Sequence, residues 1–227
     1  MYFRKKTYFF FSSQSYLPSR KMNHIDKVVY INLQKRQDRR QHIESLLSKY
    51  NIPAQRFEAI EHSPNGSANT PLNGLYGCGQ SHLAVLKLAR DNGWKNVLIL
   101  EDDILFNLPP QDFEQDIERL FTQGPEFDVF MLDINLQRSE PCPPYDWFIR
   151  VKYAHCAGAY IVKSHYYQKL IDLYEWALPL LLQTGAHWIY ANDAVWGELQ
   201  DRDAWYTFKE QVCRQMAGYS DTKNMVI

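Results

Sequence analysis

Runs of apolar residues alternate with amphipathic segments along most of the chain. Val28–Leu33, Asn96–Leu100 and Phe127–Leu132 are nearly continuous apolar runs bounded by polar residues. Such runs are typical of strands that are buried on both faces of a sheet. Three shorter segments predict further strands: Gln55–Ile60, Ala157–Val162 and Trp205–Phe208.

Helical periodicity fills the intervals between these strands. Apolar residues recur at i, i+3, i+4 and i+7 over residues 43–50, and Pro53 follows the end of that helix. Ser81 is expected to cap a helix that runs to Asn92 and stops at Gly93. Further helices are expected after Pro109-Pro110, from Ser164 to Leu182, and over Asn192–Leu199.

The order of these elements predicts the fold class. Strands and helices alternate at the spacing of βαβ units, which favours an α/β fold: a Rossmann-like, mixed but mainly parallel sheet flanked by helices. The segments 61–74 and 135–150 are rich in Pro, Gly and Asn and are expected to be loops. We expect a single domain over residues 24–227.

The first 23 residues are expected to form an extension outside this domain. They are charged and rich in Ser, and their apolar run, Tyr8–Phe11, is shorter than the ~7–15 residues of a signal-peptide core. Met22 is a second candidate for the natural start. No stretch approaches the ~20 apolar residues of a membrane-spanning helix, so no transmembrane segment is expected.

Composition and cysteine content limit which partners and which cellular compartment are expected. Lys and Arg number 25 against 26 Asp and Glu, a net charge of −1, which argues against nucleic acid as a partner. The four cysteines contain no C-x-x-C pair, so reduced thiols and a cytoplasmic location are expected. Phe, Trp and Tyr make up 15% of the chain, and such rings suit either an aromatic core or a sugar-binding surface.

Three consecutive carboxylates follow one of the buried strands. Glu101, Asp102 and Asp103 come directly after Asn96–Leu100, and open α/β sheets bind their ligands at the carboxyl ends of strands. Alternate residues of an extended chain point the same way, so Glu101 and Asp103 could offer two hard oxygen ligands to Mg²⁺ or Mn²⁺. A solvated acidic turn is the alternative interpretation.

A basic segment and a glycine-containing segment are the other candidate ligand sites. Lys35, Arg36, Arg39 and Arg40 surround the start of the first helix, where guanidinium groups could bind phosphate oxygens; a solvated charged face explains them equally well. The segment 77–82 (GCGQSH) could bring its backbone close to a ligand at a helix start, or could form a tight turn.

Together these motifs resemble glycosyltransferase family 25, which includes lipooligosaccharide and collagen galactosyltransferases. Ile31-Asn32-Leu33 followed by Arg36-Gln37-Asp38-Arg39 matches the family's I-N-L and R-x-D-R motifs. Residues 77–82 match its G-C-x-x-S-H motif, and 100–103 its L-E-D-D motif. Tyr219-Ser220-Asp221 is similar to the family's terminal S-D-I, although Thr222 replaces the last residue.

The resemblance implies a GT-A fold and transfer of a hexose, galactose or glucose, from a UDP-sugar to a glycan or protein hydroxyl with inversion. It implies bound Mn²⁺ or Mg²⁺, a role in glycan or lipopolysaccharide biosynthesis, and a nucleotide-sugar and an acceptor as partners. On this basis Asp103 and Glu101 are expected to hold the metal. The donor would be bordered by Asn32, Leu33, Arg36, Arg39, Ser81, His82 and Asp102.

Inversion by direct displacement needs a general base for the acceptor hydroxyl. Asp193 is the first candidate and Asp133 the second, although Asp193 could instead cap a helix and Asp133 could support the metal. Tyr145, Trp147 and Trp188 are candidates for stacking on an acceptor sugar. Two other functions use similar residues: nucleotidyl transfer, and sugar or nucleotide binding without turnover.

Overall fold

The computed structural model describes residues 22–64, 70–220, 225 and 226. Its main sheet has eight strands in the order β2-β1-β3-β8-β5-β9-β7-β6. The strands of the main sheet are β1 Lys27–Asn32, β2 Gln55–Glu58, β3 Asn96–Glu101, β5 Val129–Met131, β6 Asn135–Pro141, β7 Phe148–His155, β8 Ala159–Lys163 and β9 Trp205–Phe208. Two small sheets pair β4 Ile104–Phe106 with β10 Cys213–Gln215, and β11 Tyr219–Ser220 with β12 Met225–Val226.

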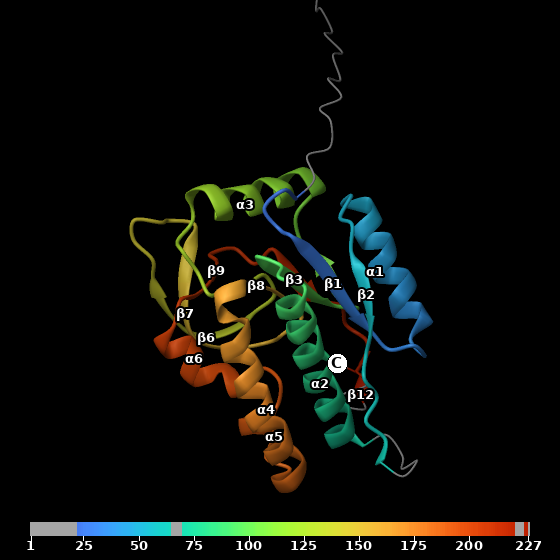
Figure 1. Cartoon of the computed structure of the whole chain (residues 1–227). Helices are drawn as coiled ribbons and strands as arrows, with labels where there is room; N and C mark the ends of the chain where they lie inside the picture. The colour runs from blue at the N-terminus through green and yellow to red at the C-terminus, as the bar shows by residue number, and fades with distance from the viewer. Residues whose placement is uncertain (1–21, 65–69, 221–224, 227) are drawn as a thin grey trace, which may run out of the picture.

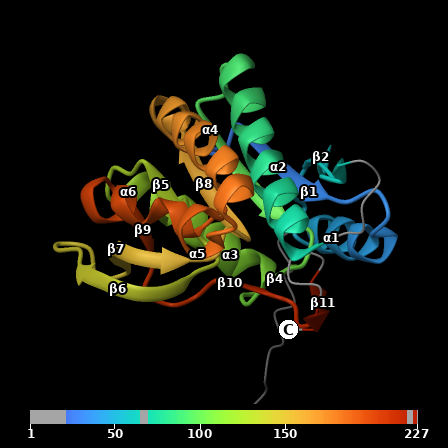
Figure 2. The ribbon, with the colours of Figure 1, turned by 90° about the horizontal axis from the view of Figure 1, so that it is seen from below.

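Helices cover both faces of the main sheet. They are α1 Gln37–Lys49, α2 Pro71–Asp91, α3 Pro110–Gln123, α4 Tyr167–Thr184, α5 His187–Tyr190 and α6 Gly197–Arg202. The views in Figures 1 and 2 show α2 and α4 side by side on one face, with α1 and α3 on the other. The α/β class with a mixed sheet between helices is therefore confirmed.

Most strands of the main sheet run in one direction. β1 is parallel to both β2 and β3, as expected of βαβ units, and β5 is parallel to β9. β8 is antiparallel to both β3 and β5, and the pairs β7–β9 and β6–β7 are also antiparallel. The sheet is therefore mixed, with β7 and β8 running against the other strands.

Alternating side chains of the central strands form two cores. Val29, Ile99 and Met131 point to the face covered by α2 and α4, whereas Leu98 and Phe130 point to the face of α1 and α3. All five are fully buried. Continuous apolar runs correctly indicated these strands because both faces of the sheet are covered.

Two elements differ from the expectation drawn from the sequence. The second helix starts at Pro71 rather than after Ser81, with the Thr70 hydroxyl accepting the N–H of Asn73. The expected loop 135–150 contains most of the β6–β7 hairpin. β6 is almost entirely exposed at the sheet edge and ends at Pro141, so it lacks the apolar pattern by which strands are identified.

The start of the described chain belongs to the fold. Met22 packs against the core beneath α1 and α3, and its carbonyl accepts the N–H of Ile25. Residues 1–21, most of the expected extension, lie outside the described residues. Within the described part, no helix is long and apolar enough to cross a membrane, and the four cysteines are free thiols.

Candidate active site

The chemically distinctive residues gather at one edge of the main sheet. β1 and β3 end side by side, which places Glu101 beside the end of β1. β8 runs the other way, so its beginning reaches the same edge, where the N–H of Glu101 donates to the carbonyl of Gly158 at 2.7 Å. The end of β5 brings Asp133 there too, since its N–H donates to the Ala159 carbonyl at 3.1 Å. Topology therefore joins segments that are distant in sequence.

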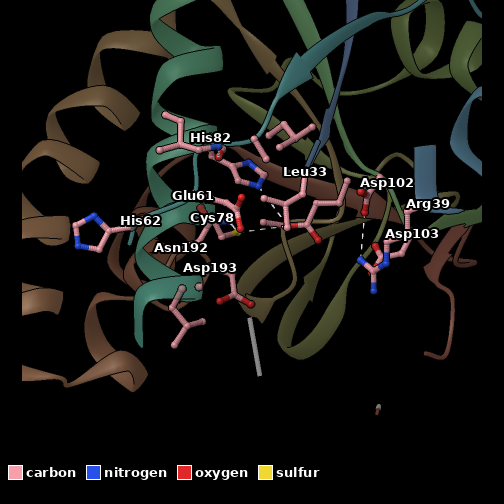
Figure 3. A pocket seen from close by; sticks show the side chains of 18 of the residues that line it. Leu33, Arg39, Glu61, His62, Cys78, His82, Asp102, Asp103, Asn192 and Asp193 are labelled. Atoms are coloured by element: carbon pink, nitrogen blue, oxygen red, sulfur yellow. Dashed lines mark hydrogen bonds and ion pairs between the residues drawn. The ribbon is translucent and has the colours of Figure 1, made fainter. Parts of the chain in front are cut away.

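A cavity of about 550 Å³ lies beside these strand ends (Figure 3). α2, the turn after β1 and the segment before α6 complete its wall. The residues expected from the sequence that line it are Leu33, Arg39, Ser81, His82, Glu101, Asp102, Asp103 and Asp193.

Arg39 joins the acidic triplet to α1. Its Nη1 lies 3.1 Å from Asp102 Oδ1 and 2.8 Å from Asp103 Oδ2. Asn32 donates from Nδ2 to Asp102 Oδ2 at 2.7 Å. Burial raises the pKa of Asp102, and the Asn32 and Arg39 contacts oppose that shift. Asp102 is thus tied to β1 and α1 on both of its oxygens.

Glu101 has a different set of partners on the other side of the cavity. His82 Nε2 lies 3.3 Å and Cys78 Sγ 3.6 Å from Glu101 Oε1, and Gln215 donates to Oε2 at 3.0 Å. Burial alone would raise the pKa of Glu101, but the contacts of His82 and Cys78, together with the charge of Arg39, outweigh it and lower the pKa. Glu101 is therefore held as a carboxylate.

His82 bridges two groups of the cavity wall. Its Nε2 lies 3.3 Å from Glu101 Oε1, and its Nδ1 lies 2.8 Å from the Tyr160 hydroxyl. His82 is fully buried. It therefore orients the Glu101 carboxylate from the α2 side.

Asp103 fits a role as a ligand for a divalent cation. Its Oδ1 is buried and meets no hydrogen-bond partner among the described residues. Burial and the charge of Glu101 raise the pKa of Asp103 to about 7. A cation bound by Asp103 and Glu101 would contact the unpartnered Oδ1 and offset the repulsion between the two carboxylates. Carboxylate oxygens are ligands that Mg²⁺ and Mn²⁺ prefer.

The two candidate bases occupy different positions. Asp193 lines the cavity, and its Oδ2 accepts the N–H of Cys156 at 2.7 Å. Asp133 is 3% exposed, outside the cavity lining, and accepts from Cys156 Sγ at 2.7 Å and from Gln211 at 3.4 Å. A Cβ on Gly158 would lie 2.4 Å from Asp133 Oδ2, so only glycine fits here. The two carboxylates thus flank Cys156 from opposite sides.

The remaining predicted donor residues are only partly brought together. Asn32 lies behind the cavity wall and acts through Asp102. Arg36 pairs with Asp38 of the same helix and is outside the lining. The basic segment therefore contributes Lys35 and Arg39 to the cavity.

The glycine-containing segment has a different role from either expectation. Residues 77–82 lie inside α2, where the Ser81 hydroxyl donates to the Gly77 carbonyl at 2.7 Å and accepts the N–H of Ile60 at 2.8 Å. A Cβ on Gly77 would lie 2.4 Å from the Ile60 carbonyl oxygen, and one on Gly79 would lie 2.5 Å from Leu178. The glycines let other parts of the protein approach the helix, rather than a ligand.

The aromatic candidates for acceptor binding do not form one wall. Tyr145 packs edge-on to Phe148 at the second core, and the Trp147 ring lies 4.3 Å from the Arg119 guanidinium of α3. Both are outside the cavity lining. Trp188, on α5, is also outside the lining and is 67% exposed. It lies shortly before Asp193 in the chain, whereas the β6–β7 hairpin carries the other two away.

Some cavity residues were given no role from the sequence. Cys78 and Asn192 face the cavity from α2 and from the segment before α6, and Gln215 reaches it from β10. At the rim, Lys35 of the predicted basic segment forms an ion pair with Glu61. The i, i+4 spacing of Cys78 and His82 was a readable signal; the approach of Gln215, which depends on β10 pairing with β4, was not. Asp221 and Thr222 lie outside the described residues.

The fold is that of an α/β protein with a cavity beyond the carboxyl ends of its parallel strands, the position at which open α/β sheets bind ligands. The family model of glycosyltransferase family 25, described as LPS biosynthesis protein, matches residues 25–180. This match spans more than half of the chain, and the chain belongs to glycosyltransferase family 25.

Two solved structures are similar to this chain. A197 from STIV is 11% identical, with a TM-score of 0.45, over 88% of this chain and 93% of that one. A glycosyltransferase involved in the glycosylation of the major capsid of PBCV-1 is 10% identical, with a TM-score of 0.47, over 87% of this chain and 95% of that one.

Proposed function

We propose that this glycosyltransferase moves a hexose from a UDP-sugar to a hydroxyl of a glycan or protein acceptor, with inversion and with a divalent cation bound at Asp103 and Glu101. The observation that carries the proposal is that Glu101 and Asp103, the latter ion-paired with Arg39, line the same cavity in a chain of this family. A diphosphate brings negative charge, which the cation and Arg39 would balance.

The three acidic residues at the end of β3 have different proposed roles in binding the donor. Asp103 would offer its orphaned Oδ1, and Glu101 a carboxylate oriented by His82 and Gln215. Mn²⁺ or Mg²⁺ bound there supplies Lewis acidity to the leaving diphosphate. Asp102, fixed by Asn32 and Arg39, would border the ribose or the transferred sugar.

Asp193 is the proposed general base. Its side chain lines the cavity while the Cys156 N–H fixes one of its oxygens. The other oxygen could accept the proton of an acceptor hydroxyl. The buried position of Asp133 favours a supporting role through Cys156.

Trp188 remains the proposed aromatic contact for the acceptor. Its exposure on α5 would let a flat ring stack on a sugar that approaches Asp193.

The test is a screen of UDP-hexoses for UDP release, with Mn²⁺ and with chelator. Metal-dependent release from one donor, increased by an acceptor, is expected. Release of pyrophosphate from a nucleoside triphosphate would instead identify a nucleotidyltransferase, and tight UDP binding without release would identify a binding domain.

A further inference from the structure

A second set of potential metal-ligating atoms lies in the same cavity. Cys78 and His82 stand at i and i+4 on α2, so they share one face of the helix. Both face Glu101 at the end of β3: Cys78 Sγ lies 3.6 Å and His82 Nε2 lies 3.3 Å from Glu101 Oε1. The three ligand atoms all lie within 4.8 Å of one another. Figure 3 shows Cys78 and His82 on α2 beside the cavity.

The two separations from Glu101 fit the edges of a tetrahedral site. Zinc binds sulfur at about 2.3 Å, imidazole nitrogen at about 2.0–2.1 Å and carboxylate oxygen at about 2.0–2.2 Å. Around a tetrahedron these bond lengths place the ligand atoms about 3.3–3.6 Å apart. The two distances to Glu101 therefore already match the edges of a zinc site.

The residues behind the ligands are arranged as in metal sites. His82 is fixed in the Nε2-facing orientation by the Tyr160 hydroxyl at Nδ1. The second oxygen of Glu101 accepts from Gln215, and Asn192 Nδ2 lies 3.6 Å from Cys78 Sγ. Such outer hydrogen bonds orient first ligands and strengthen metal binding.

We propose that Cys78, His82 and Glu101 form a binding site for a thiophilic divalent cation, with Zn²⁺ as its best fit. Thiolate and imidazole ligands favour Zn²⁺, whereas Mn²⁺ and Mg²⁺ prefer the oxygen ligands around Asp103. On binding, the Cys78 thiol gives its proton to solvent and the thiolate takes the metal. His82 binds through an unprotonated Nε2 and keeps its proton on Nδ1, which donates to the Tyr160 hydroxyl. Glu101 would belong to both sites, so Zn²⁺ here would compete with a cation shared between Glu101 and Asp103.

The experiment uses Co²⁺ as a spectroscopic substitute for Zn²⁺ on metal-free full-length protein. Tetrahedral Co²⁺ with a thiolate ligand gives a near-ultraviolet charge-transfer band and intense visible bands. We expect both bands in wild type, saturating at one equivalent and removed by Zn²⁺. Cys78→Ser should lose the charge-transfer band. Cys142→Ser, the same change at a half-buried thiol outside the cavity lining, should keep it.

Two results would overturn the site: no charge-transfer band in wild type, or a band that survives in Cys78→Ser. If Cys78→Ser does not fold, wild-type protein decides the question. Zn²⁺ should then slow alkylation of Cys78 but not of Cys142, measured by mass spectrometry, and equal rates with and without Zn²⁺ would contradict the proposal. Both readouts measure binding and need no sugar donor, so they are independent of the proposed transferase activity.

Discussion

At the scale of single residues, neighbouring carboxylates take different roles because their surroundings differ. Glu101 is held ionised by contacts from α2, whereas burial and the Glu101 charge favour the protonated form of Asp103. Asp193 has a different partner, the backbone N–H of Cys156, which donates to its Oδ2. All three side chains are carboxylates, so it is the contacts of each oxygen that separate the proposed metal ligands from the proposed base.

Asp193→Asn tests the proposed base. Because the amide cannot take up the acceptor proton, the rate of metal-dependent UDP release with acceptor should fall at least about 100-fold. Calorimetry should find UDP binding with Mn²⁺ nearly unchanged. Asp172→Asn, the same change at an exposed position on α4, serves as the control and should leave both measurements unaltered. Loss of UDP binding in Asp193→Asn would show that Asp193 acts on the donor instead.

At the scale of elements, close packing of α2 depends on what its glycines contact. A Cβ added at Gly77 would contact the backbone carbonyl of Ile60, whereas a Cβ added at Gly79 would contact the flexible side chain of Leu178. Both substitutions to Ala gain about 1 kcal/mol of helix propensity, and overpacking typically costs about 1–3 kcal/mol. Since backbone yields less than a side chain, Gly77→Ala should be less stable than Gly79→Ala by about 1 kcal/mol or more in urea unfolding. Equal stability of the two variants would contradict this.

Asp203, between α6 and β9, should make the free energy of unfolding depend on pH in the acidic range. Burial alone would raise the pKa of Asp203, but hydrogen bonds from Arg202, Tyr166 and Lys169 outweigh it and lower the pKa to about 2. The folded state thus favours the carboxylate, so this contribution is present above the ordinary pKa of about 4. It is lost as pH falls towards about 2.

Asp203→Asn isolates that contribution. At neutral pH the variant should have a free energy of unfolding lower by on the order of 1 kcal/mol, because the ionic partners lie partly in solvent. Urea unfolding at a series of pH values should show wild type and variant converging between about pH 4 and pH 2. A difference that stays constant over this range would show that the Asp203 charge is not responsible.

The sequence predicted elements well where one local pattern determines them. β1, β3 and β5 have continuous apolar runs, and Gly93, with φ of 66°, ends its helix region as expected. The β6–β7 hairpin and the first ten residues of α2 were missed, because an exposed edge strand and a helix containing three glycines lack those patterns. Strand direction also cannot be predicted from local patterns. Nothing within Ala157–Val162 indicates that β8 pairs antiparallel with both of its neighbours.

At the scale of the whole molecule, the mixed sheet explains why the site could be predicted only in part. The parallel strands β1 and β3 bring Asn32 and the acidic triplet together, which a βαβ order already implies. The approach of Cys156, Asp193 and Gln215 depends on β8, the segment before α6 and β10, whose positions follow from long-range pairing. The motifs thus identified the side of the cavity proposed to bind the donor, and long-range pairing supplies the rest of its wall.

Because the cavity joins both halves of the sheet, ligand binding should stabilise the domain as one unit. UDP at 100 times its dissociation constant adds about 2.7 kcal/mol, which for a protein of this size raises Tm by roughly 5–10 °C. We expect this shift in scanning fluorimetry with UDP and Mn²⁺, and a much smaller one with chelator. Asp103→Asn should lose the Mn²⁺-dependent part, while Asp172→Asn should retain it. A UDP-induced shift of equal size with Mn²⁺ and with chelator would show that the nucleotide binds without the cation proposed at Asp103 and Glu101.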